Sequence, residues 1–390
     1  MKKPKKNFWE ERSRMSNIPK LRFPEFKGEW EEKKLGECLT LLYGKDWKDK
    51  SSTKKLYPVL GTGGVISYID EFIYDKPCVL IGRKGSINNP VFIDKPFWTV
   101  DTQFYSEIHE GYSPKFLYYI FCTENWSKHD ESTGVPSLSA KNVENTHKHI
   151  PSYSEQQKIA DFLSNVDSII TAETKILNTL QKKKKALMQK LFTRQLRFKS
   201  DDGKDFPAWE EKKLGDVCSY IGGGTPSKKV KEYWNGNINW ASVKDITGKY
   251  LYETQDKISQ LGADSSATNI CEPDSLLLIT RMSPGKTVIT KCITAINQDL
   301  KIVKSYINVE FLHLLFQSIQ TKIDEKTSGT TVKGISIEGL NQIDIRLPCK
   351  AEQQKIADCL SSMDSLIQTQ QKVVTTWQQR KKALLQQMFI

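Results

Sequence analysis

The chain has 390 residues, which is enough for two or three domains that each bury a core of their own. Hydrophobic residues make up 38% of it, and no apolar run approaches the length of a membrane span, which excludes a helical membrane protein. The formal net charge of +12 favours a polyanionic partner such as nucleic acid, because basic residues that meet phosphates release counterions.

The first part of the chain is predicted to be a basic tail over residues 1–17 and a mixed domain over residues 18–150. No apolar stretch follows the first lysines, so the tail is not a secretory signal. Ser113 is expected to cap a helix that begins at Pro114. Short apolar runs between turn signals predict strands, which include Tyr57–Leu60, Val79–Ile81 and Val91–Ile93.

A long helix is predicted over residues 151–196, because neither Pro nor Gly occurs from Ser154 to Gln195. Ser154 is expected to cap this helix, with Gln157 completing a capping box. Apolar residues recur at spacings of four and three as far as Leu191, which is the heptad pattern of a coiled-coil seam, although Glu173 and Lys184 interrupt it. The seam residues are Ile159, Leu163, Val166, Ile170, Leu177 and Leu180.

The second half of the chain follows the same plan. Residues 197–205 are predicted to be a polar linker, residues 206–347 a second mixed domain and residues 348–390 a second long helix. Gln370 and Lys381 interrupt the second seam, which runs on to Met388, as Glu173 and Lys184 interrupt the first. The second seam consists of Ile356, Leu360, Met363, Ile367, Val374 and Trp377.

Two heptapeptides occur twice without a change. Trp30–Gly36 returns as Trp209–Gly215, and Glu155–Asp161 returns as Glu352–Asp358. The repeat is far longer than the 20–50 residues typical of solenoids, so it indicates a duplicated domain. The segments between these anchors differ, which predicts a shared structural role for the anchors and two different roles for the interiors.

Neither predicted helix can bury its seam alone, so each needs a partner. We predict an α+β fold of two tandem mixed α/β domains. The two long helices are expected to join them as an antiparallel coiled coil with approximate two-fold symmetry. The alternative is that each helix packs on its own domain.

No complete catalytic or metal site is present in the sequence. Gly61-Thr62-Gly63 followed by Asn89-Pro90 is only partly similar to the methyl-donor and base-flipping motifs of an adenine methyltransferase. Gly285-Lys286-Thr287 lacks the first glycine of a phosphate-binding loop. The eight cysteines include no Cys-x-x-Cys pair, which indicates reduced thiols in a cytoplasmic protein. No cofactor and no metal are therefore expected.

Polar and basic clusters on the predicted loops are the candidate DNA contacts, because Lys and Arg bind phosphates while Arg, Asn and Ser can also bind base edges. In the first domain they are Lys45, Lys48, Lys54, Lys55, Arg83, Lys84, Ser86, Asn88, Asn89, Ser137, Ser139 and Lys141. In the second they are Thr225, Ser227, Lys228, Lys229, Trp240, Ser242, Lys244, Arg281, Ser283, Lys286, Thr330, Thr331 and Lys333.

The order of these segments resembles the specificity subunit of type I restriction–modification systems. Pro24–Trp30 leading to Leu35-Gly36, and Phe206–Trp209 leading to Leu214-Gly215, are similar to the starts of its two target recognition domains. The two copies of Glu-Gln-Gln-Lys-Ile-Ala, each preceded by a proline, are similar to its two helical regions. The resemblance covers residues 18–390.

The resemblance implies a subunit that catalyses nothing and binds a two-part sequence in double-stranded DNA. It also implies docking to two methyltransferase subunits, which bring S-adenosylmethionine, and to restriction subunits that use ATP, in the cytoplasm and away from any membrane. The alternatives are a stand-alone DNA adenine methyltransferase and a generic coiled-coil DNA-binding adaptor.

Overall fold

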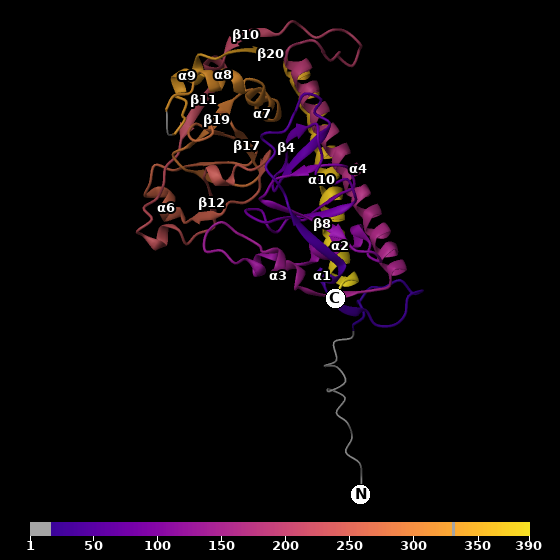
Figure 1. Ribbon diagram of the computed structural model, residues 1–390. Coiled ribbons are helices and arrows are strands. Elements are labelled where there is room, and N and C mark those ends of the chain that lie inside the picture. The colour runs from indigo at the N-terminus through magenta and orange to yellow at the C-terminus, as the bar shows by residue number, and fades with distance from the viewer. Residues whose placement is uncertain (1–16, 330–331) are drawn as a thin grey trace. The chain divides into compact units, whose positions relative to one another are not determined.

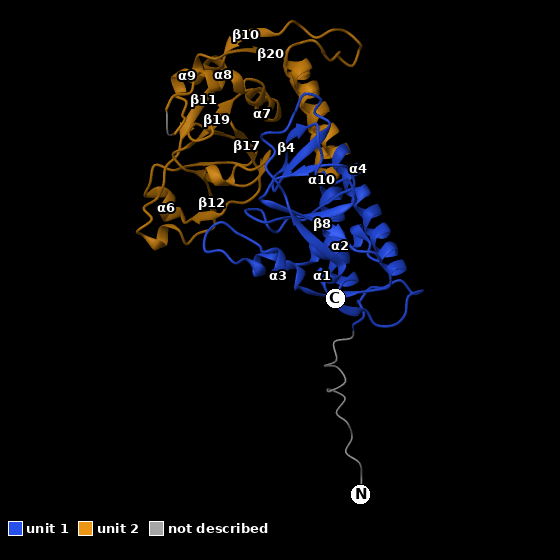
Figure 2. Cartoon of the chain, viewed as in Figure 1, with its two compact units in different colours: residues 1–175, 371–390 blue, residues 176–370 orange. Residues whose placement is uncertain are grey.

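The computed structural model describes residues 17–329 and 332–390, so the predicted basic tail lies almost wholly outside the described residues. The chain forms two compact units (Figure 2). Unit 1 contains residues 1–175 and 371–390, and unit 2 contains residues 176–370. None of the helices in the described ranges is both long and apolar enough to cross a membrane.

Unit 1 contains a two-stranded, a three-stranded and a four-stranded sheet, in the orders β1-β9, β4-β3-β7 and β2-β8-β5-β6. Figure 1 labels β4 and β8 of the two larger sheets. The predicted strands are present, and Ser113 caps α2 with Pro114 at its first position, as expected. The elements are β1 (Glu31–Lys34), α1 (Leu35–Cys38), β2 (Leu39–Tyr43), β3 (Tyr57–Gly61), β4 (Gly64–Ile69), β5 (Cys78–Gly82), β6 (Val91–Ile93), β7 (Trp98–Thr99), β8 (Gln103–Ile108), α2 (Pro114–Thr123), η2 (Trp126–His129), α3 (Ala140–Glu144) and β9 (His147–Ile150).

Unit 2 repeats this plan with one more strand in each of the two larger sheets, whose orders are β11-β19-β16-β17-β13 and β14-β12-β18-β15. The third sheet pairs β10 with β20, as β1 pairs with β9. The elements are β10 (Glu210–Lys213), α5 (Leu214–Val217), β11 (Cys218–Gly222), η3 (Lys231–Tyr233), β12 (Ile238–Ala241), η4 (Val243–Asp245), β13 (Tyr250–Leu251), β14 (Asp256–Ile258), α6 (Gln260–Asp264), β15 (Asn269–Cys271), β16 (Leu276–Ile279), β17 (Thr287–Thr290), β18 (Thr294–Ile296), β19 (Leu300–Ser305), α7 (Val309–Ser318), α8 (Gln320–Glu325), α9 (Ile337–Asn341) and β20 (Asp344–Leu347).

The two long helices are α4 (Tyr153–Phe192) and α10 (Lys350–Met388), each with one end in unit 1 and the other in unit 2. The prediction that Ser154 caps α4 is wrong, because the helix starts one residue earlier and Ser154 lies in its first turn. All twelve predicted seam residues are buried or half-buried. The first turns of each helix pack into a domain core, since Ile159 lies in the core of unit 1 and Ile356 in that of unit 2.

The repeated heptapeptides form the same buried ionic contact in both units. Glu155, at the start of α4, accepts from Arg22 Nε at 2.7 Å, from Arg22 Nη2 at 2.8 Å and from Trp30 Nε1 at 3.3 Å. Glu352, at the start of α10, accepts from Arg197 at 3.1 and 2.6 Å and from Trp209 Nε1 at 3.0 Å. Both glutamates are at most 1% exposed, so the repeated Trp and Glu serve to hold each helix on its domain.

The glutamine that follows each glutamate has an equally repeated role. Gln156 accepts from the Ser113 N–H at 2.9 Å, and its own amide donates to the Pro151 carbonyl at 3.0 Å. Gln353 accepts from the Asn308 N–H at 3.3 Å and donates to the Pro348 carbonyl at 2.9 Å. Each glutamine thereby ties the N-terminus of α2 or α7 to the start of a long helix.

Candidate DNA interface

Three of the predicted contact loops of unit 1 meet at the turn between β7 and β8. The Lys45 N–H donates to the Thr99 carbonyl at 2.9 Å, and the Arg83 N–H donates to the Thr102 carbonyl at 2.8 Å. The Leu138 N–H donates to the Arg83 carbonyl at 2.9 Å, which adds the segment before α3 to the same place. Clusters far apart in the sequence therefore form one surface region on unit 1.

Arg83 is held in a defined direction within this region. Its guanidinium lies 5.3 Å from the centre of the Tyr43 ring, and Nη1 donates to the Asp101 carbonyl at 3.2 Å. Tyr43 is 52% exposed and was not predicted as a site residue. Its position at the end of β2, directly before the lysine-rich loop, is the sequence signal that could have indicated it.

The corresponding loops of unit 2 meet at the turn between β18 and β19. The Gly224 N–H donates to the Ile296 carbonyl, the Asn297 N–H donates to the Ala241 carbonyl, and the Thr280 N–H donates to the Asp299 carbonyl, all at 2.9–3.0 Å. These bonds bring together the glycine-rich loop after β11, the end of β12 and the end of β16. The loops therefore meet at the equivalent turn in both units, between β7 and β8 in unit 1 and between β18 and β19 in unit 2.

The backbone hydrogen bonds show that Arg83 and Arg281, although each follows an apolar strand, do not occupy equivalent positions in the two units. Arg83 accepts from Leu138, and the equivalent bond in unit 2 runs from the Ile335 N–H to the Thr280 carbonyl. Arg281 therefore corresponds to Lys84, and each of these two residues forms an isolated bridge with the segment before α3 or α9. Arg281 also forms an ion pair with Asp299 at 3.4 Å.

Most of the predicted contact residues have exposed side chains. In unit 1 the exposed ones are Lys45, Lys48, Lys54, Lys55, Lys84, Ser86, Asn88, Asn89 and Lys141, while Arg83, Ser137 and Ser139 are half-buried. In unit 2 the exposed ones are Thr225, Ser227, Lys228, Lys229, Lys244, Arg281, Lys286 and Lys333, while Ser242 and Ser283 are half-buried. Thr330 and Thr331 lie outside the described residues.

Several predicted residues support the loops. Trp240 is 5% exposed and donates to the Gly224 carbonyl at 3.1 Å, so its indole belongs to the core and is not retained as a candidate contact. Ser139 caps α3, and Ser242 shares Asp245 with its own N–H. Asn88 accepts from the Trp126 N–H at 2.8 Å. The polar side chains of Ser139, Ser242 and Asn88 are therefore explained by their role in shaping the loops, without any contact to DNA.

The loop between β2 and β3 is shaped by one carboxylate. Asp70 accepts from the Ser51 and Thr53 hydroxyls and from the N–H groups of Lys54 and Lys55, at 2.7–2.8 Å. These hydrogen bonds, led by that of Ser51, lower the pKa of Asp70 to about 2. Lys55 takes a left-handed φ of 53°, a backbone conformation that this clamp stabilises. The lysines of this loop are thus presented on a fixed backbone.

The geometry excludes the nucleotide and methyl-donor motifs considered from the sequence. Gly61-Thr62-Gly63 lies at the tight turn of the antiparallel hairpin β3–β4, where a methyl-donor loop would instead lead from a strand into a helix. Gly285-Lys286-Thr287 likewise connects the antiparallel strands β16 and β17. Within the described residues, no group of three or more His, Cys, Asp or Glu side chains could hold a metal ion.

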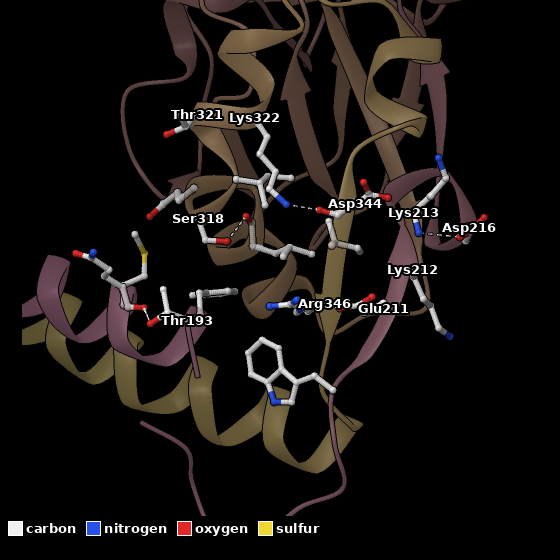
Figure 3. Close-up of a pocket in the computed structure, with 18 of the residues that line it drawn as sticks. Thr193, Glu211, Lys212, Lys213, Asp216, Ser318, Thr321, Lys322, Asp344 and Arg346 are labelled. Carbon is white, nitrogen blue, oxygen red and sulfur yellow. Dashed lines mark hydrogen bonds and ion pairs between the residues drawn. The ribbon is translucent and has the colours of Figure 1, made fainter. Parts of the chain in front are cut away.

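A hollow of about 1150 Å³ in unit 2 lies beside the last turns of α4, next to β10, β20, α7 and α8 (Figure 3). Two of its basic side chains have partners: Lys322 Nζ donates to the backbone carbonyl of Asp344 at 2.6 Å, and Arg346 pairs with the Glu211 carboxylate at 2.9 Å. None of the predicted contact residues lines it. We therefore place the candidate interface on the loops and not in this hollow.

Comparison with known proteins gives the family. The model of the type I restriction modification DNA specificity domain matches residues 27–182 and, a second time, residues 208–376. The chain belongs to this family. The two matches each run from a repeated tryptophan anchor into a long helix, as the internal repeat does.

Relatives are named specificity subunits of type I restriction enzymes. The MjaIX subunit of Methanocaldococcus jannaschii is 32% identical over 180 residues, which are 44% of this chain and 42% of that protein. The MjaVIII subunit of the same organism is 25% identical over 398 residues, covering 94% of this chain and 92% of that protein. The chain thus matches less than half of one relative and nearly all of the other.

A solved structure shows the same fold. The crystal structure of the S subunit of a type I restriction–modification system from M. genitalium has a TM-score of 0.63 with this chain at 15% identity. The match covers 96% of this chain and 99% of that one. At this identity the likeness shows the fold and leaves the contact residues to be argued from the chain itself.

Proposed function

We propose that this chain is the DNA-recognition subunit of a type I restriction–modification complex, with unit 1 binding one half of a two-part DNA sequence and unit 2 the other. The observation that carries this proposal is that two domains of one topology present unlike polar loops at the same turn of the fold. A shared frame with divergent loops suits two readers of different sequences.

We further propose that α4 and α10 pair as an antiparallel coiled coil that sets the distance between the two half-sites. Within unit 1, Asp167 pairs with Lys381, and Ile159 shares a core with Met388. Residues nearer the start of α4 therefore contact residues nearer the end of α10, as in an antiparallel pair. Within unit 2, Lys184 pairs with Asp364, and Leu191 shares a core with Ile356. Residues nearer the end of α4 thus contact residues nearer the start of α10, which is again the antiparallel order.

In this proposal the chain itself catalyses nothing, binds no cofactor and acts in the cytoplasm. Two methyltransferase subunits would supply S-adenosylmethionine and methylate adenine, and restriction subunits would supply ATP-dependent cleavage. The hairpin geometry of Gly61-Thr62-Gly63 argues against the stand-alone methyltransferase. S-adenosylmethionine binding by the isolated chain, measured by calorimetry, would support that alternative and count against ours.

Domain exchange tests the two-reader proposal. Residues 206–347 are replaced with the matching domain of a relative, and methylated adenines are mapped across DNA from cells that carry the complex. We expect one half of the methylated sequence to change and the other to stay. A generic DNA-binding adaptor predicts no defined methylated sequence at all, and a change in both halves would mean that the units do not act separately.

Lengthening the helical segment tests whether α4 and α10 set the distance between the half-sites. Four residues inserted near Thr193, just beyond the end of α4, add roughly one helical turn of about 5.4 Å. We expect the gap between the half-sites to lengthen while both half-sites keep their sequence. An unchanged gap in an active complex would show that the helices do not set the distance.

A further inference from the structure

A carboxylate at the same place in each repeat is shared between the long helices and a domain. In unit 1, Asp167 of α4 pairs with Lys381 of α10, with 2.6 Å between Lys381 Nζ and Oδ1. Tyr119 of α2 donates its hydroxyl to the other oxygen, Oδ2, at 2.8 Å. Tyr119 is 2% exposed, so its hydroxyl reaches Asp167 from inside the domain. Asp167 thus connects both helices to the globular part of unit 1.

In unit 2 the equivalent carboxylate is Asp364 of α10, which pairs with Lys184 of α4. Here the domain supplies Lys249, the residue before β13, in place of a tyrosine. Lys249 Nζ donates to Ser361 Oγ at 2.8 Å, forms an ion pair with Glu310 of α7 at 2.7 Å and lies 3.7 Å from Asp364 Oδ2. Ser361 corresponds to Ser164, whose hydroxyl lies 3.4 Å from Tyr119 Oη.

The helix side of the contact is therefore identical in the two units, and the domain side differs. Tyr119 brings a neutral hydroxyl, whereas the side chain of Lys249 is 9% exposed and brings a charge. Burial lowers the pKa of Lys249, but the hydrogen bond and charge of Glu310 outweigh it and leave the pKa raised. Lys184 and Lys381 interrupt the two apolar seams, and these contacts account for the interruptions.

We propose that Tyr119 and Lys249 are positioning residues, which fix the place of each domain on the helices and so decide which gap between half-sites the protein accepts. This inference rests on the proposed function. Successive nucleotides in one DNA strand are about 3.4 Å apart, so a domain that shifts by a few ångströms presents its loops to the neighbouring base pair. Tyr119 and Lys249 would act through Asp167 and Asp364 without touching DNA.

The test uses the full chain assembled with its methyltransferase subunits. Methylation rates are measured on duplexes that carry both half-sites with the native gap, one base pair less and one base pair more. Tyr119→Phe keeps the ring and removes only the hydroxyl. We expect methylation at the altered gaps, relative to the native gap, to rise about tenfold, the scale of one hydrogen bond to a charged group. Tyr118→Phe on the same helix is the matched control and is expected to keep the wild-type preference.

Variants in unit 2 provide a second, independent test. The double variant Lys249→Met with Glu310→Gln removes both charges and leaves no unpaired ion, and it is expected to relax the gap preference as Tyr119→Phe does. Lys249→Arg keeps the charge and is expected to retain the preference. A wild-type complex that methylates all gaps equally would overturn the proposed function itself. If the wild type discriminates, a Tyr119→Phe variant that behaves like Tyr118→Phe, or one that loses activity at every gap along with thermal stability, would overturn only the positioning role.

Discussion

Units 1 and 2 share their strand order around the central sheet and the contacts that hold the start of each long helix, and they differ in the loops. The Glu155 and Glu352 contacts use the same donor and acceptor atoms of Arg and Glu, whereas the loop after β2 has lysines from Lys45 onward and the loop after β11 has Gly223 and Gly224 ahead of its lysines. The anchor residues Trp30 and Trp209, which hold Glu155 and Glu352 of the repeated helices, are identical, whereas Tyr119 and Lys249, which meet the helices further along, differ. Parts that would meet different DNA sequences have diverged, so the comparison separates scaffold from recognition.

The largest effect on stability is expected from removing the contact that both units share, that of Glu155 and Glu352 with an arginine. Glu155→Gln and Glu352→Gln each remove the charge from a buried carboxylate that binds an arginine through two hydrogen bonds. The arginine then lacks its charged partner and keeps only a backbone carbonyl, and we expect each variant to lose about 3–5 kcal/mol of unfolding free energy. Denaturant unfolding of the full chain measures the loss, which should be similar for the two variants because the contacts are.

Glu25→Gln is the matched control. Glu25 pairs with Lys158 at 3.5 Å, and both side chains are about half exposed. An exposed pair of this kind contributes less than about 1 kcal/mol. A loss in Glu155→Gln no greater than in Glu25→Gln would show that the repeated glutamates do not hold the helices, and unequal losses at Glu155 and Glu352 would show that the two units are not equivalent there.

A second prediction concerns a buried group that only unit 2 has. His313 of α7 occupies the position of Tyr118 in α2, and its Nδ1 lies 2.9 Å from Thr287 Oγ1. Burial, followed by the positive charge of Lys249, lowers the pKa of His313 to about 4 from 6.5. Below pH 6.5 the unfolded chain therefore takes up a proton that the folded unit does not.

The stabilisation from neutral His313 is complete above pH 6.5 and is lost as the pH falls toward 4. We expect unit 2 to lose about 2–4 kcal/mol across this window, in addition to losses that both units share. Hydrogen exchange followed by mass spectrometry reports on each unit separately. His313→Gln should abolish the extra acid sensitivity of unit 2, and an equal loss of protection in both units of the wild type would contradict the prediction.

The scaffold could be predicted from the sequence to a much greater extent than the interface. The repeat, the long helices, their seams and the cap at Ser113 follow from periodicity and local hydrogen bonding, which are encoded in nearby residues. The Arg22–Glu155 contact could not be found in this way, because Arg22 and Arg197 do not stand at the same distance from the repeated anchors.

The interface depends on contacts between distant segments. The equivalence of Arg281 with Lys84 is defined by hydrogen bonds to the segments before α9 and α3, which lie some fifty residues further along the chain. Trp240 was expected on a loop with polar residues, but it lies in β12, where its ring packs in a buried cluster with Ile258 and Ala295. Tyr43 was missed because its contact with Arg83 joins residues 40 positions apart in the sequence, although its place before the lysine-rich loop was a signal.

The smallest effect is expected from substitutions in the loops, and it concerns the affinity of the assembled complex for DNA. Arg83→Ala should weaken binding of the assembled complex to DNA by about 1–3 kcal/mol, and only where the first half-site is present, because the Tyr43 ring and the Asp101 carbonyl hold the guanidinium in the fixed direction that base recognition needs. Lys84→Ala is the comparison, since Lys84 is exposed and more suited to a phosphate. It should weaken binding on all sequences and reduce the slope of affinity against salt by about one. Titrations of matched and mismatched duplexes over a salt series distinguish the two results. Uniform weakening in Arg83→Ala would make it a phosphate contact, and unchanged affinity with an unchanged slope would remove Arg83 from the interface.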